Sequence, residues 1–117
     1  MCGQVRQAHT TIRPGMTLTV RHTDGTYRQY PWGILSQGRL IYNARQEELI
    51  QTWGRMRERV EIQLDGFYEQ DRNKQWVYFD VPTLASGIIV NGSVLLITSK
   101  ATGEVLRIHN RQPALVV

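Results

Sequence analysis

Apolar and polar residues alternate along most of the chain, at the spacing of two that is typical of strands with one buried face. Residues 17–30 alternate on both sides of Asp24-Gly25, and residues 87–97 are apolar on both sides of Asn91-Gly92. Both dipeptides favour tight hairpin turns, so each segment predicts a β-hairpin. The other strand-like runs are residues 40–42, 60–64, 67–69, 76–79, 105–108 and 114–117.

One segment follows a helical spacing instead. Its apolar residues recur every three or four positions, and Asn43 precedes them at a position suited to an N-cap. Glu47 and Glu48 would lie in the first turn, where the helix dipole favours acidic side chains. The apolar residues are Leu49, Ile50, Trp53 and Met56. We therefore predict one main helix over about 43–56.

The fold class that these elements predict is α+β and mostly β: a curved, partly closed, barrel-like antiparallel sheet with that one main helix. The 117 residues suit a single domain over 1–117, and 41% apolar and 21% charged residues are typical of a soluble globular protein. The chain has neither an apolar run of roughly 18–20 residues nor a secretion-signal pattern, so we expect no membrane partner and no export.

The cysteine content restricts the chemistry further. Cys2 is the only cysteine, which excludes an internal disulfide and favours a reducing, cytoplasmic location. His9 and His22 lack partners at a spacing that is typical of metal ligands, and no phosphate loop or dinucleotide motif is present. We therefore expect no metal and no cofactor, and a monomer is our expectation for the oligomeric state.

The charge balance favours an anionic partner. The formal net charge is +4, and the chain has twelve arginines and two lysines. Arginine pairs with phosphate through a planar fork and stacks on bases, so nucleic acid is a plausible partner. The alternative is a basic surface that only water and counterions contact.

Cys2 is the main candidate for chemistry. If Met1 is removed, the chain begins with a residue that carries an α-amine and a thiol on adjacent carbons. Such a group can trap an aldehyde as a thiazolidine ring, or act as an N-terminal nucleophile on an amide. Three polar residues at strand ends are candidates to assist it, with ordinary structural alternatives: Asn43 as a helix cap, Glu69 as an outward-facing strand residue and His109 as a satisfied histidine.

Several short motifs, in order, resemble those of the SOS-response-associated peptidase (SRAP) family. They are Met1-Cys2-Gly3, Trp32-Gly33, Asn43-Ala44-Arg45, the segment 65–69 and the segment 109–113. The resemblance implies a β-rich domain with a basic groove for single-stranded DNA. It also implies a thiazolidine crosslink between the N-terminal cysteine and abasic sites, which shields the lesion in the DNA damage response, and a peptidase activity that removes Met1.

The resemblance also implies roles for individual residues. Cys2 would be the nucleophile, Asn43 would orient it, Glu69 would move protons, and His109 would act on the ring-opened aldehyde. The residues expected to contact DNA are Arg45, Arg6, Arg39, Arg111 and Trp32.

Two other functions remain open: an N-terminal-nucleophile peptidase or amidohydrolase, and a basic β-module that binds nucleic acid without chemistry. Geometry distinguishes a site from scattered residues. If the chain has the predicted site, Cys2, Asn43, Glu69 and His109 should converge with contacts of about 2.6–3.2 Å. Glu69 should be at least partly buried with a raised pKa, and the site should open onto a groove lined by Arg45 and at least one of Arg6, Arg39 and Arg111.

Overall fold

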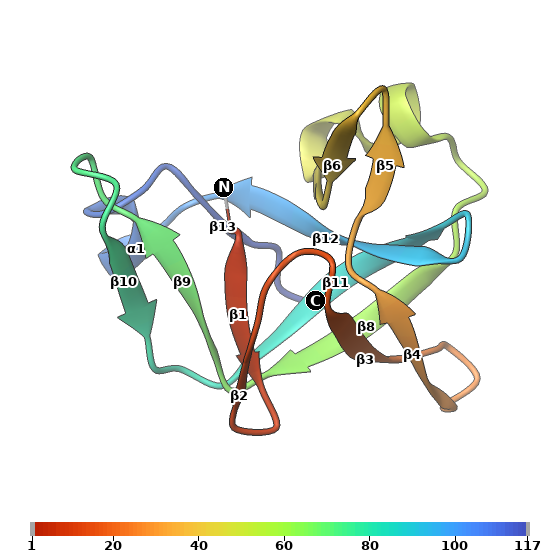
Figure 1. Cartoon of the computed structure of the whole chain (residues 1–117), viewed down its shortest axis with the longest axis horizontal. Helices are drawn as coiled ribbons and strands as arrows, with labels where there is room; N and C mark the ends of the chain where they lie inside the picture. The colour runs from red at the N-terminus through yellow and green to blue at the C-terminus, as the bar shows by residue number, and fades with distance from the viewer. Residues whose placement is uncertain (1, 117) are drawn as a thin grey trace.

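The computed structural model describes residues 2–116, and strands make up most of them (Figure 1). The largest sheet has seven strands, six of which form a path in the order β13-β12-β11-β8-β3-β4. These strands are antiparallel to their neighbours. Their bounds are β3 (Thr17–Arg21), β4 (Tyr27–Pro31), β8 (Arg59–Leu64), β11 (Thr83–Val90), β12 (Ser93–Lys100) and β13 (Arg111–Pro113).

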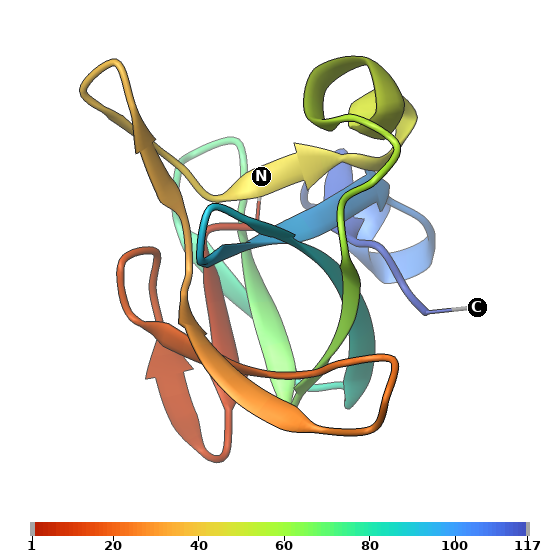
Figure 2. The same ribbon diagram turned by 90° about the vertical axis from the view of Figure 1, so that its right-hand side faces the viewer.

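The seventh strand, β7 (Asn43–Arg45), pairs with β12 in parallel. A second, four-stranded sheet has the order β10-β9-β1-β2, and β5 (Ile34–Ser36) pairs with β6 (Arg39–Ile41) as a separate hairpin. The bounds in the second sheet are β1 (Gln4–Gln7), β2 (Thr10–Ile12), β9 (Gly66–Gln70) and β10 (Trp76–Phe79). The two larger sheets curve around a common interior, and the prediction of a mostly β fold is confirmed (Figure 2).

Strand β12 explains why the apolar run at 94–97 does not alternate with polar residues. Val94 and Leu96 pack into the main core, whereas Leu95 and Ile97 pack into a second apolar cluster on the opposite face of the sheet. All four side chains are fully buried. A strand that is covered on both faces needs apolar side chains at every position, as this one has.

The predicted helix over 43–56 is wrong in both extent and type. Residues 43–45 form β7, because Asn43 lies opposite Leu96 of β12 and is in no position to cap a helix. Within 43–56, helical structure is confined to a 3-10 turn at Gln46–Glu48 and a π-helical turn at Leu49–Trp53. The apolar stripe is only partly buried, since Met56 is 96% exposed.

The C-terminal predictions also need correction. The segment 105–108 was expected to be a strand, but Gly103–Leu106 forms the short helix α1. The last strand is β13, which precedes the expected run at 114–117. The turn that contains α1 is closed by a hydrogen bond from the Ala101 backbone N–H to the Asn110 carbonyl at 3.0 Å. Met1 and Val117 lie outside the described residues.

Across residues 2–116, no helix has the length and apolar character that crossing a membrane would require.

Candidate active site around Cys2

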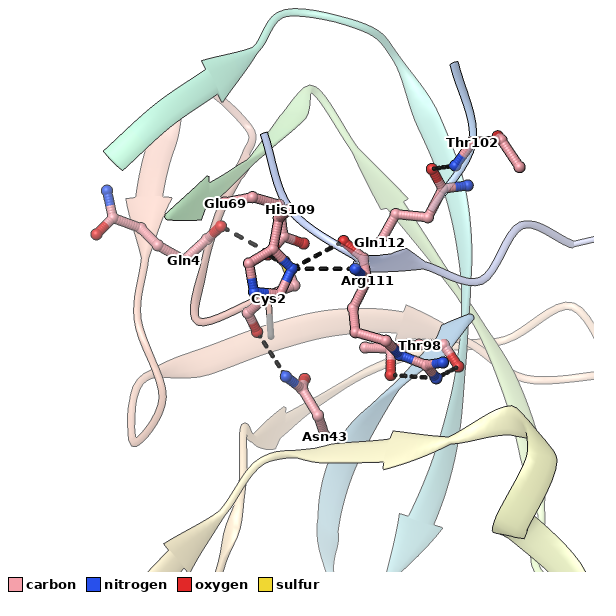
Figure 3. Close-up of polar contacts among 9 residues, drawn as sticks. All are labelled: Cys2, Gln4, Asn43, Glu69, Thr98, Thr102, His109, Arg111 and Gln112. Carbon is pink, nitrogen blue, oxygen red and sulfur yellow. Dashed lines mark hydrogen bonds and ion pairs between the residues drawn. The ribbon is translucent and has the colours of Figure 1, made fainter. Parts of the chain in front are cut away.

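The four residues proposed as catalytic come together at one place (Figure 3). β1 pairs with β9 so that Gln4 lies opposite Tyr68, which brings Cys2 beside the end of β9 that carries Glu69. β7 and β13 both pair with β12, which brings Asn43 and the segment before Arg111 into the same region. Sheet pairing therefore assembles the site from four segments that are distant in sequence.

Asn43 holds the backbone of the N-terminal segment. Its Nδ2 donates a hydrogen bond to the Cys2 carbonyl at 2.8 Å. The Oδ1 atom of Asn43 is buried and accepts no hydrogen bond from the described residues. The amide thus fixes the position of Cys2 and leaves a buried acceptor next to it.

The Cys2 thiol is fully buried and hydrogen-bonded. Its Sγ donates to the Gln4 carbonyl at 3.7 Å, and the Glu69 carboxyl is close enough to interact with it electrostatically. Burial raises the pKa of the Cys2 thiol well above its ordinary value, and the negative charge of Glu69 raises it further. The thiol is therefore protonated at neutral pH and needs a nearby base before it can react as a thiolate.

Glu69 is suited to be that base. Its side chain is completely buried, and this burial raises the pKa of the Glu69 carboxyl to about 7. A carboxyl group with such a pKa gives up and takes back a proton near neutral pH. The predicted burial and pKa shift of Glu69 are both present.

His109 lies next to Glu69, with its Nδ1 3.6 Å from the Glu69 Oε1. The Arg111 backbone N–H donates to that same Nδ1 at 3.0 Å. Because Nδ1 accepts this hydrogen bond, the neutral ring carries its proton on Nε2. Burial lowers the pKa of His109, so the neutral form prevails at pH 7.

Arg111 is predicted to contact DNA, but its side chain is buried inside the protein. Its guanidinium is buried and donates to both Glu47 carboxylate oxygens, at 2.9 and 3.2 Å, and to the Thr98 carbonyl at 2.8 Å. The side chain therefore ties β13 to β12 and to the 3-10 turn. Its backbone positions His109, and its side chain does not line a groove.

Trp32 is also placed differently from the prediction. Its side chain is fully buried, and its Nε1 donates to the Tyr42 carbonyl at 2.8 Å. The indole packs edge-on against the Tyr42 ring, with the two centroids 5.9 Å apart. Trp32 is part of the core and has no surface for a nucleobase.

The other predicted DNA contacts are spread over the molecule. Arg45 at the end of β7 and Arg39 in the β5–β6 hairpin are exposed. Arg6 is half-buried near the far end of β1, in a hollow that it shares with Asp65 and Asp80. These three arginines are not gathered in one groove beside Cys2.

Sequence reasoning missed two aromatic residues beside the site. A Cβ atom on Gly3 would lie 3.3 Å from the Trp76 ring and 3.3 Å from the Tyr42 hydroxyl, so both rings flank the residue after Cys2. Trp76 is 44% exposed, and burial raises the pKa of Tyr42, with smaller contributions from Cys2 and Glu69. Aromatic residues in strands are usually core residues, and only the glycine next to the cysteine signals such a close approach.

Nothing in residues 2–116 gathers three or more histidine, cysteine, aspartate or glutamate side chains that could hold a metal ion.

Comparisons with known proteins support the fold but leave the function open. No family model matches the chain, and no curated protein does either. Among solved structures, the chain is similar to the crystal structure of a phage-related protein from Bordetella bronchiseptica, with a TM-score of 0.71 and 19% sequence identity. The match covers 98% of this chain and 77% of that one. The two proteins therefore share a fold over nearly the whole of this chain.

Proposed function

We propose that this protein reacts through Cys2 with abasic sites in single-stranded DNA and forms a stable thiazolidine crosslink, as the motifs that resemble the SRAP family imply. The observation that carries the proposal is the buried Cys2–Glu69 pair, in which a buried thiol lies within electrostatic reach of a buried carboxyl whose pKa is raised to about 7. Asn43 and His109 complete the group. Core packing alone does not require these four side chains to meet.

The reaction begins once Met1 has been removed and Cys2 carries the α-amine. The amine attacks the aldehyde carbon of the ring-opened sugar and gives a carbinolamine, which loses water to form an imine. The thiol then adds to the C=N bond and closes the five-membered ring. One water is released, and no oxidant or reductant is consumed.

Each proton transfer has a suitable group. Protonated Glu69 gives its proton to the hydroxyl that leaves the carbinolamine, and the resulting carboxylate takes the proton of the Cys2 thiol. Glu69 thus ends the cycle as it began. Neutral His109, with a proton on Nε2, is suited to exchange a proton with the sugar oxygen as the ring opens. Asn43 holds the Cys2 backbone while the bonds form.

The test is the intact mass of the protein after incubation with an abasic single-stranded oligonucleotide. We expect a covalent adduct that equals protein without Met1, plus the oligonucleotide, minus one water. Cys2→Ser should bind the oligonucleotide but form no stable adduct, because an oxazolidine is less stable than a thiazolidine. The matched control is the same oligonucleotide without the lesion.

The outcomes also separate the alternatives. An adduct in the Cys2→Ser variant would contradict the proposal. Wild-type protein that binds DNA but forms no adduct would be a basic module without chemistry, and steady cleavage of an amide substrate would indicate a peptidase that uses Cys2 as its nucleophile.

A further inference from the structure

A basic surface lies on the segment that follows the π-helical turn. Arg55, Arg57 and Arg59 line a hollow of about 350 Å³ together with Trp53. The rest of its wall is formed by Leu49, Ile50, Gly54 and Ile88. This hollow is built by other residues than those of the Cys2 site. Figure 2 shows the segment descending from the helical turns to β8 on the side that faces the viewer.

The three arginines have no acidic partner among residues 2–116, although Glu58 lies between two of them in sequence. Glu58 is hydrogen-bonded to the His22 Nδ1 instead, and the His22 Nε2 is bonded to the Tyr30 hydroxyl at 2.8 Å. The Glu58 carboxylate is thus bound to His22 and not to the neighbouring arginines. Within residues 2–116, the three positive charges at positions 55, 57 and 59 therefore have no ion pair.

One of the arginines is held in place by the backbone of Trp53. The Arg57 Nε donates to the Trp53 carbonyl at 2.8 Å, which leaves the two terminal nitrogens of its guanidinium available to an anion. Trp53 packs on one side against the second apolar cluster and is only partly buried. An arginine fork and a partly exposed indole that line the same hollow suit a phosphate and a neighbouring base.

The basic surface lies on the face of the large sheet opposite to Cys2, because Leu49, Trp53 and Ile88 pack in the second apolar cluster whereas Cys2 packs in the main core. Arg59 also lines a neighbouring hollow of about 470 Å³, whose wall includes Gln46 and Arg21. Arg21 is paired with Glu61 at 3.2 Å, so the uncompensated charge remains at positions 55–59.

From these observations we propose that the Arg55–Arg57–Arg59 hollow binds the phosphate backbone of single-stranded nucleic acid, with one base against Trp53. Arginines that neutralise phosphates release counterions, and an aromatic ring stacks on an unpaired base, whatever its sequence. A duplex hides the faces of its bases inside the stack, so the hollow suits a single strand. This inference rests on the proposed function only in that both take single-stranded nucleic acid as the partner.

The test measures binding of lesion-free oligothymidylate by fluorescence anisotropy over a range of salt concentrations. The triple variant combines Arg55→Gln, Arg57→Gln and Arg59→Gln. It should bind at least about tenfold more weakly, and the slope of log affinity against log salt should fall by about two units. The control combines Arg28→Gln, Lys74→Gln and Lys100→Gln, which removes the same charge elsewhere and should change the slope by less than about one unit. Trp53→Leu should weaken binding at an unchanged slope.

Two results would overturn the proposal: a triple arginine variant that binds like the control variant, or wild-type protein that binds a duplex of equal length more tightly than the single strand. Circular dichroism of each variant verifies that it is folded, and a folded Arg57→Gln variant replaces the triple variant if the latter is not. Adduct formation by wild-type protein is measured separately on abasic DNA. Failure of that reaction alone contradicts the role of Cys2, and failure of the salt-slope test alone contradicts the role of this hollow.

Discussion

At the scale of single residues, Glu69 is the residue whose environment departs furthest from that of an ordinary strand residue. Its position on β9 places a carboxyl group in the interior, opposite Val77 of β10 and beside a buried thiol. Burial disfavours the charged form, so the folded protein keeps a proton that the unfolded chain releases at lower pH. A group suited to proton transfer therefore lowers the stability of the fold at neutral and basic pH.

We expect Glu69→Gln to be more stable relative to wild type at pH 8 than at pH 5. The pKa of Glu69 is raised from 4.5 to about 7, so the folded state binds more protons than the unfolded state, and wild-type stability falls as pH rises through this interval. The amide does not titrate, and the difference between the two pH values should approach about 3 kcal/mol. Urea unfolding at both pH values measures it.

The control for this experiment is Glu48→Gln, which removes an exposed carboxylate and should show no such difference. A Glu69→Gln variant whose relative stability is the same at both pH values would show that Glu69 has an ordinary pKa. The variant should also form the DNA adduct much more slowly, because an amide cannot exchange a proton with the carbinolamine or the thiol.

The sequence was enough to select the four residues of the site, but it was not enough to predict whether Trp32 and Arg111 are exposed. Cys2 could be selected because of its N-terminal position, and Asn43, Glu69 and His109 because they are polar residues at the ends of predicted strands, within motifs that resemble those of the SRAP family. Trp32 and Arg111 were assigned to DNA by motif alone, but a motif does not specify whether a side chain is exposed. In the structure both are buried, and each donates to a backbone carbonyl.

At the scale of elements, hairpins could be predicted and the segment after β6 could not. The β3–β4 and β11–β12 hairpins have local signals, because alternation and an Asp-Gly or Asn-Gly turn lie within one short stretch. β7 has no local signal. Its three residues are a strand only because β12, about fifty positions later, offers a parallel partner.

The same segment contains Glu47, whose carboxylate forms an ion pair with Arg111. This ion pair joins the 3-10 turn to β13. We expect Glu47→Gln to destabilise the fold, because the buried Arg111 guanidinium would lose its carboxylate partner. Glu48→Gln, one residue along, is the matched control and should stay within about 0.5 kcal/mol of wild type. Chemical denaturation at pH 7 compares the two.

This comparison also separates the structural role of Arg111 from a role in binding. Since the guanidinium is buried, Glu47→Gln in its folded state should bind lesion-free single-stranded DNA as wild type does. A Glu47→Gln variant that is as stable as Glu48→Gln would show that the ion pair between Glu47 and Arg111 contributes nothing to stability.

At the scale of the whole molecule, the arrangement of charge differs from the expectation more than the fold does. The sequence indicates an excess of four positive charges but cannot place them, because side chains far apart in the chain neutralise each other only after folding. Arg21 and Arg111 are paired with Glu61 and Glu47. The basic face is formed by the three arginines that have no acidic partner among residues 2–116, which are Arg55, Arg57 and Arg59.

This separation between a buried reaction centre and an exposed basic face predicts how salt affects the reaction. With dilute abasic DNA, the observed rate of adduct formation should fall steeply as salt rises, because encounter and binding depend on long-range attraction that salt screens. With saturating DNA, the rate should change little, because Cys2 and Glu69 are buried and react in a complex that is already formed. Single-turnover kinetics at both concentrations make the comparison.

The triple variant at positions 55, 57 and 59 sharpens this prediction. It should react more slowly than wild type at low DNA concentration, lose most of the salt dependence there, and approach the wild-type rate at saturation. A triple variant that is slower than wild type by the same factor at both concentrations would mean that the arginines act on the chemical step. In that case the basic face and the Cys2 site would have to be treated as a single centre.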